Sequence, residues 1–161
     1  MKVLLFFLFL ISIAFWIGSM FFFSLFTAPT VFKVLPQQQA GNLISHIFSK
    51  YYTVAYICGL IALITSSVIW FVENNGKRNI YLARVILILV MLVLMVIAGE
   101  IIRPKALEAR AKLRELPSNS AGYLEKQKRF AKLHTVSVAI NATVFLLGVT
   151  TVFITAYTIK E

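Results

Sequence analysis

The sequence predicts an all-α integral membrane protein, a four-helix bundle that forms a single transmembrane domain over residues 1–161. No charged residue stands between Lys2 and Lys33, or from Tyr51 to Val72. The stretch from Leu133 to Ile159 contains no aspartate, glutamate, lysine or arginine, and one histidine, His134. Each stretch exceeds the roughly 20 apolar residues that a spanning helix needs. With 60% hydrophobic residues, the composition suits a membrane domain and leaves no room for a separate soluble one.

The third span is the shortest. Only 15 residues, Val85 to Gly99, separate Arg84 from Glu100. A span of about 20 residues must therefore bring Arg84 or Glu100 to the edge of the hydrocarbon. The four predicted spans cover about residues 3–32, 43–72, 80–102 and 133–159.

The first span contains a proline near its end. Pro29 removes a backbone hydrogen bond and can kink the helix, and the hydroxyl of Thr27 or Ser24 can satisfy a freed carbonyl. Pro36 and three glutamines mark the turn that follows. The second helix is expected to begin near residue 41 or 42.

Lysine and arginine predict the orientation. With four spans, the two termini and the 73–79 loop share one side, which carries five basic residues against eleven on the other. The positive-inside rule then places both termini outside the cytoplasm, in a bacterial inner membrane. The net charge of +10 becomes mostly a cytoplasmic collar that attracts anionic lipid head groups. No aromatic-interleaved basic module accompanies this charge, which argues against nucleic-acid binding.

The connection between the third and fourth spans is itself helical in pattern. Residues 104–115 are rich in helix formers, and Glu108 stands four residues before Lys112. Residues 116–120 interrupt the pattern, which resumes from Ala121 and continues into the fourth span. We therefore expect a cytoplasmic helical hairpin extending from helices three and four.

Polar residues near the span ends give the best clue to function, because polar groups at membrane depth require partners. Topology places these residues in one leaflet, and the candidate ligand-binding residues are His46, Glu100, Arg103, His134, Ser137 and Asn141. Spacings of i, i+3 and i+7 put the last three on one stripe of the fourth helix. This stripe is expected to face the third or first helix, close to Glu100 and Arg103.

The second helix carries a matching stripe of His46, Ser49 and Thr53, with Tyr52 and Tyr56 beside it. A helix bundle is expected to turn both stripes inward, since lipid offers them no partner.

Structural interpretations account for the same residues. The polar stripe on the fourth helix can serve only as interhelical hydrogen-bonding contacts, worth roughly 0.6 to 2 kcal/mol each. Glu100 and Arg103, three residues apart, can simply pair with each other. No residues have the spacing of a metal motif, so we predict no metal site.

Two motifs resemble a known family. They are Trp16 to Phe23 with Ala28 to Phe32, Leu35-Pro36, Ala40-Gly41 and Phe48 to Tyr52, and then Arg129 to Asn141. Over nearly the whole chain the sequence is similar to the transmembrane protein 205-like family, in bacteria the domain of unknown function 4149. The resemblance implies a four-helix membrane protein without a settled activity, and the link of its eukaryotic relative to platinum-drug resistance suggests transport.

Trp16-Ile17-Gly18 is also more distantly similar to J-type protoporphyrinogen oxidases and copper-resistance D proteins. That likeness raises haem as a cofactor, although the haem-ligating pattern of those proteins cannot be placed on this sequence. Separately, topology puts His46 and His134 in one leaflet, where two histidines of a helix bundle can ligate haem axially.

Three functional classes stay open. The favoured class is a non-enzymatic protein for small-molecule or ion binding, permeation or resistance, with a polar inner-leaflet site. The second is a haem-binding membrane redox protein. The third is a structural subunit of a homo-oligomer or a larger membrane complex, which would use the same groups only for packing.

Overall fold

The computed structural model describes residues 2–73, 78–117 and 120–160, and within these ranges all regular structure is helical. The elements are α1 (Lys2–Phe22), the π-helix η1 (Phe23–Thr27), α2 (Ala28–Val34), α3 (Gln37–Val72), α4 (Arg78–Val96), the π-helix η2 (Ile97–Ile102), α5 (Arg103–Arg114) and α6 (Ala121–Lys160). In the described residues, four continuous helical stretches are long and apolar enough to cross a membrane: Lys2–Val34, Gln37–Val72, Arg78–Arg114 and Gly122–Thr158.

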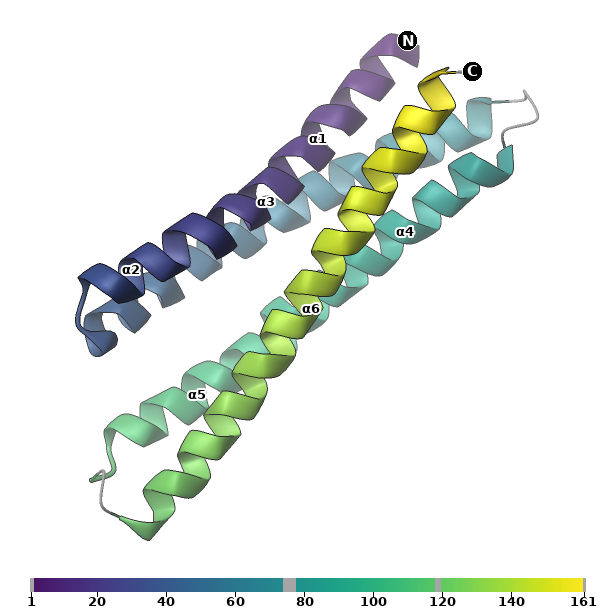
Figure 1. Ribbon diagram of the computed structural model, residues 1–161. Helices are drawn as coiled ribbons and strands as arrows, with labels where there is room; N and C mark the ends of the chain where they lie inside the picture. Colours follow the sequence, from purple (N-terminus) through teal and green to yellow (C-terminus); the bar gives the residue numbers. More distant parts are fainter. Residues whose placement is uncertain (1, 74–77, 118–119, 161) are drawn as a thin grey trace.

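The helices pack in a chain of neighbours (Figure 1). Helix α1 lies against α3, α3 against α4, and α4 against α6, while α6 also touches α1. Both the start of α1 and the end of α6 lie at one end of the molecule, called here the termini end. At the opposite end, called the hairpin end, the α2–α3 pair diverges from the α5–α6 pair.

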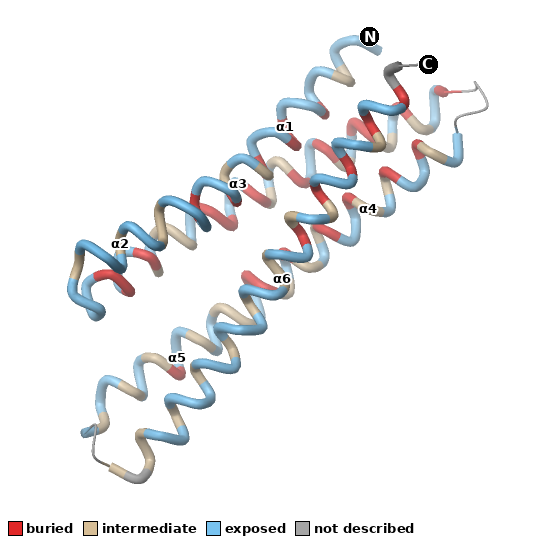
Figure 2. The backbone as a smooth tube through the Cα atoms, in the orientation of Figure 1, coloured by how far each residue is buried: buried red, intermediate tan, exposed pale blue. Residues whose placement is uncertain are grey.

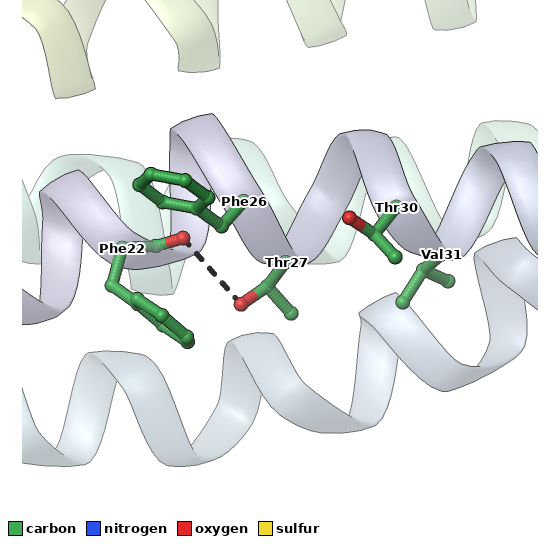
Figure 3. Close-up of a pocket in the computed structure, with 5 residues that line it drawn as sticks. All are labelled: Phe22, Phe26, Thr27, Thr30 and Val31. Carbon is green, nitrogen blue, oxygen red and sulfur yellow. Dashed lines mark hydrogen bonds between the residues drawn. The ribbon is translucent and has the colours of Figure 1, made fainter.

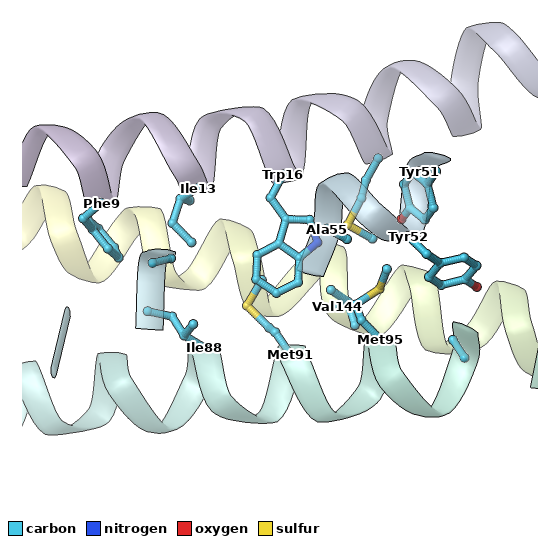
Figure 4. Close-up of a cluster of buried hydrophobic side chains, with 13 residues drawn as sticks. Phe9, Ile13, Trp16, Tyr51, Tyr52, Ala55, Ile88, Met91, Met95 and Val144 are labelled. Carbon is cyan, nitrogen blue, oxygen red and sulfur yellow. The ribbon is translucent and has the colours of Figure 1, made fainter. Parts of the chain in front are cut away.

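Small residues let the helices approach closely in the core, where Trp16 reaches from α1 toward α4 (Figure 4). A Cβ on Gly59 of α3 would lie 3.0 Å from the Trp16 indole and 2.7 Å from Leu92 Cδ1. On α6, a Cβ at Gly148 would lie 2.8 Å from the Ile17 side chain. Such close approach is how membrane helices gain packing energy, because lipid supplies no hydrophobic driving force between them.

The outward faces of the helices are exposed (Figure 2), and many of the residues on them are large and apolar. Large side chains such as Phe15 of α1 and Phe153 of α6 are 63% and 73% exposed. In water, so much exposed apolar surface would promote aggregation. In the hydrocarbon of a bilayer, the same surface contacts apolar lipid chains. The four long helices and their apolar faces together place the chain in a lipid bilayer.

Helix α3 begins at Gln37, earlier than the start near residue 41 or 42 expected from sequence. Pro36 precedes the first turn, and its carbonyl oxygen accepts the Ala40 amide at 2.9 Å. Proline is tolerated at a helix start and glutamine is a good helix former, so the helix can extend over the three glutamines.

Candidate functional site

Two adjacent tyrosines of α3 face a polar pair on α6. The hydroxyl of Tyr51 donates to Asn141 Oδ1 at 3.0 Å, and Asn141 Nδ2 donates to the Ser137 carbonyl oxygen at 2.9 Å. The hydroxyl of Tyr52 interacts with the side chains of Ser137 and Asn141. Both tyrosines are buried, 7% and 3% exposed respectively. The amide of Asn141 is thereby held between α3 and its own helix.

A third tyrosine meets the acidic residue of η2. The hydroxyl of Tyr56 lies 3.0 Å from Glu100 Oε1, to which it donates, and 3.5 Å from the Met95 carbonyl oxygen. Gly99 makes this approach possible, since a Cβ there would lie 2.1 Å from the Tyr56 hydroxyl oxygen. The carboxylate of Glu100 remains on the exposed side of the helix.

Arg103 completes this group from the first turn of α5. Its guanidinium interacts electrostatically with Tyr52 and Tyr56, and its Nε is buried without a hydrogen-bond partner. Among the described residues, no ion pair joins Arg103 to Glu100. The three-residue spacing expected to pair them fails because Glu100 lies in a π-helix, whose wider turn changes which residues share a face.

The two π-helices have a common sequence cause and border the same cluster. Each ends two residues before a proline, η1 before Pro29 and η2 before Pro104. Proline lacks the N–H that an α-helix needs, so the preceding turn relaxes into wider spacing. In η1 the hydroxyl of Thr27 donates to the Phe22 carbonyl oxygen at 3.5 Å (Figure 3).

Aromatic rings connect η1 to the tyrosines. The ring centroid of Phe23 lies 5.6 Å from that of Tyr51 and 4.8 Å from that of Phe48. Tyr52 is in turn 6.2 Å from Tyr56. We call the combined group the tyrosine site, and its members are Tyr51, Tyr52, Tyr56, Glu100, Arg103, Ser137 and Asn141.

The two histidines lie apart from the tyrosine site. His134 is exposed and stacks on Phe130, with ring centroids 6.2 Å apart. His46 is also exposed, and its Nδ1 hydrogen-bonds the Asn42 carbonyl oxygen at 2.9 Å. Each histidine makes these contacts within its own helix, and in the described part of the chain no three His, Cys, Asp or Glu side chains gather as metal ligands would. The structure therefore separates His134 from Ser137 and Asn141 of the same predicted stripe, and it leaves both histidines outside the tyrosine site.

The stripe of Ser49 and Thr53 on the second span also faces outward, contrary to the sequence-based expectation. The Thr53 hydroxyl donates to the Ser49 carbonyl oxygen at 3.1 Å. A serine or threonine hydroxyl can thus satisfy itself on its own helix and needs no inward position. The buried face carries aromatic and small residues instead: Tyr51, Tyr52, Ala55, Gly59, Ala62 and Ser66.

Arg84 is one of the two residues that the short third span was expected to bring to the hydrocarbon edge. The structure buries it inside the helix packing, at 0% exposure, which the sequence did not predict. Its Nε donates to Ser66 Oγ at 2.9 Å, and its guanidinium carbon lies 4.4 Å from the Phe9 ring centroid and 5.0 Å from that of Tyr81. Both terminal nitrogens, Nη1 and Nη2, are buried without a partner. A guanidinium so placed carries a substantial desolvation cost.

The spacing of residues in the third span could have predicted that Arg84 is buried. It shares a heptad-like series with Tyr81, Ile88, Met91 and Met95, all of which are buried. Steps of three and four residues mark one face of a helix. At the same end, Lys2 Nζ lies 3.3 Å from Glu73 Oε2.

Four apolar membrane-crossing helices, packed around aromatic and small residues, define the chain as an all-helical integral membrane protein. The sequence profile of the domain of unknown function DUF4149 matches residues 11–115, and the chain belongs to that family. An uncharacterized protein of Aquifex aeolicus (strain VF5) is 31% identical over 135 residues, which are 84% of each chain. No solved structure matches the chain at a significant level.

Proposed function

We propose that the chain is a non-enzymatic membrane protein that binds small amphipathic molecules at the tyrosine site. The observation that carries the proposal is the convergence of two π-helices on one cluster of aromatic rings and polar groups. π-Helical turns recur at functional sites because they relax the backbone where a ligand or a movement must be accommodated. Such binding is the first step of permeation or resistance, the roles implied by the resemblance described above.

The chemistry of the site favours a cationic head group. Glu100 presents a carboxylate on the exposed side, and the half-buried Tyr56 that donates to it offers an aromatic face. A cation over such a ring gains roughly 0.5–2 kcal/mol, and the carboxylate adds direct attraction. Arg103 is half-buried beside the tyrosines, so the more accessible charge in the group is negative.

Tetraphenylphosphonium and tetraphenylborate, which match in size and differ in sign, test this proposal. The purified protein is expected to bind the cation more tightly in equilibrium dialysis. Glu100→Gln is expected to weaken that binding roughly tenfold, about 1.4 kcal/mol. Glu125→Gln removes an exposed carboxylate from α6, outside the site, and serves as the matched control.

Equal binding by the Glu100→Gln and Glu125→Gln proteins would refute the proposed ligand site. A structural role for the same groups is the second candidate, and one observation favours it. The side chain of Asn141 is already satisfied by Tyr51 and by the Ser137 carbonyl. A purely structural role is indicated if Asn141→Leu lowers thermal stability while cation binding stays unchanged.

We further propose that the hairpin end faces the cytoplasm of a bacterial cell and that both termini lie outside. Since Arg84 is buried in the helix packing, the termini side keeps four basic residues against eleven at the hairpin side. The difference in basic residues between the two sides, on which the positive-inside rule depends, is therefore larger than the count from sequence alone. It also gives the hairpin end a basic collar suited to anionic lipids.

A fusion after Glu161 tests the orientation. An alkaline phosphatase domain placed there is expected to be active, because that enzyme folds only outside the cytoplasm. A cytoplasm-dependent fluorescent reporter at the same position is expected to be dark, and a bright one would reverse the topology.

A further inference from the structure

Two arginines of α5 cross to the first turns of α3 at the hairpin end. Arg110 Nη1 donates to Ser45 Oγ at 3.3 Å, and its Nη2 donates to the Gln38 carbonyl oxygen at 3.4 Å. Arg114 Nη2 donates to Asn42 Oδ1. Long side chains, more than close backbone packing, therefore join α3 to α5.

A hollow of about 140 Å³ lies between these elements. Its lining residues are Asn42, Ser45, His46, Leu107, Arg110, Ala111 and Arg114. They contribute two guanidinium groups, an imidazole, an amide and a hydroxyl, and no carboxylate. The volume is well above the roughly 10–15 Å³ that a single water occupies. The lining of the hollow thus includes two positively charged guanidinium groups and no negatively charged side chain.

The backbone of α3 makes room for this arrangement. A Cβ on Gly41 would lie 1.5 Å from Arg110 Nη2, so the guanidinium rests directly on the helix at a glycine. Glycine inside a helix lowers stability by roughly 0.5–1 kcal/mol relative to alanine. At this position it also permits the Arg110 guanidinium to contact the helix backbone, which a larger residue would prevent.

The guanidinium donors are only partly used. Each guanidinium has five N–H donors. The bonds to α3 occupy two on Arg110 and one on Arg114. Helix α5 contains one acidic residue, Glu108, and its carboxylate is paired with Lys112. The remaining donors can therefore serve an anion in the hollow.

We propose that this hollow binds a phosphate group held by the guanidinium forks of Arg110 and Arg114. Arginine is suited to the task because its planar fork matches the oxygens of a phosphate and stays charged. The phosphate comes either from a lipid head group or from a soluble phosphate. The hollow is one specific binding place within the basic collar. Its position at the membrane surface rests on the orientation proposed above, and its chemistry is independent of the tyrosine site.

Native mass spectrometry of the full chain with added lipids tests the proposal. The probes are phosphatidic acid and diacylglycerol with the same acyl chains. The wild type is expected to retain phosphatidic acid in preference to diacylglycerol. Arg110→Gln with Arg114→Gln is expected to reduce that retention roughly tenfold, because charge-assisted hydrogen bonds are lost.

Lys105→Gln with Lys128→Gln is the matched control, since it removes the same charge from exposed positions outside the hollow. Retention close to that of the wild type is expected for this control. An equal loss in both double variants would show that the general positive charge of the collar retains the lipid, and would overturn the proposed phosphate site in the hollow.

Arg110→Lys with Arg114→Lys preserves charge and keeps the test valid if the glutamine variant does not fold. It is expected to lose most of the preference for phosphatidic acid, because lysine lacks the planar fork. Wild-type retention in this variant would overturn the proposed binding mode.

Inorganic phosphate separates the two sources. If it displaces phosphatidic acid from the wild type, the hollow accepts soluble phosphate; if only the lipid is retained, the lipid head group is the ligand. Equal wild-type retention of phosphatidic acid and diacylglycerol, with no binding of inorganic phosphate, would rule out both sources.

Discussion

Gly59→Leu is expected to lower the free energy of unfolding by at least roughly 1–3 kcal/mol, because added side-chain atoms would enter a packed core. The first atom alone would lie 3.0 Å from the Trp16 ring and 2.7 Å from Leu92 Cδ1. The side chain of Trp16 is fully buried, at 0% exposure, so the added atoms would press on the inside of the core. Thermal unfolding of the purified protein, followed by circular dichroism, measures the effect.

Gly18→Leu provides the matched control on α1. No heavy atom lies within 4 Å of a Cβ built at Gly18, which is exposed. Leucine there would face lipid and favour the helix, so the melting temperature is expected to stay the same or rise. If both leucine variants melt alike, α1 and α3 do not pack as described.

Arg84 is expected to show the second large effect, and its substitution by methionine or by alanine should change stability by different amounts. Arg84→Met removes a buried charge with two unpartnered nitrogens and keeps most of the volume. Stability is expected to stay level or to rise by up to about 1–4 kcal/mol, as when other buried charges are replaced by apolar groups. Arg84→Ala should be less stable than Arg84→Met by roughly 2–5 kcal/mol, because it leaves a cavity among aromatic rings.

Arg78→Met serves as the control, since that arginine is exposed and its guanidinium carbon lies over the Trp70 ring, 5.5 Å from the centroid. Little change in melting temperature is expected there. If Arg84→Met proves as unstable as Arg84→Ala, the Ser66 bond and the contacts with Phe9 and Tyr81 outweigh the desolvation cost, and Arg84 is a stabilising residue.

The four spans were predictable because long charge-free stretches leave few alternatives to membrane helices. Pro29 also predicted a disturbed backbone near the end of the first span, and η1 is found there. The matching effect of Pro104 was not anticipated, since that proline was assigned to the start of the hairpin and not to the end of a span. Its π-helix moves Glu100 out of line with Arg103 and toward Tyr56.

The orientation of individual side chains was less predictable, for a physical reason. Polarity in a membrane span predicts an inward position, yet Thr53 bonds to its own helix and faces outward. Conversely, Arg84 is buried although it carries a charge, because Ser66 accepts a hydrogen bond from it and three aromatic rings lie against its guanidinium. Sequence therefore predicted that Asn141 needs a partner, but not that Tyr51 would provide it.

The placement of Trp16 gives the protein an intrinsic optical reporter. The chain has two tryptophans, and they sit in contrasting surroundings. The indole of Trp16 is fully buried among apolar side chains where α1 meets α3, so its emission falls at short wavelength. Trp70 is half-buried near the termini end and has a cation over its ring. In a Trp70→Phe protein, the colour of the remaining emission therefore follows the separation of α1 from α3, within a bilayer and without any attached dye.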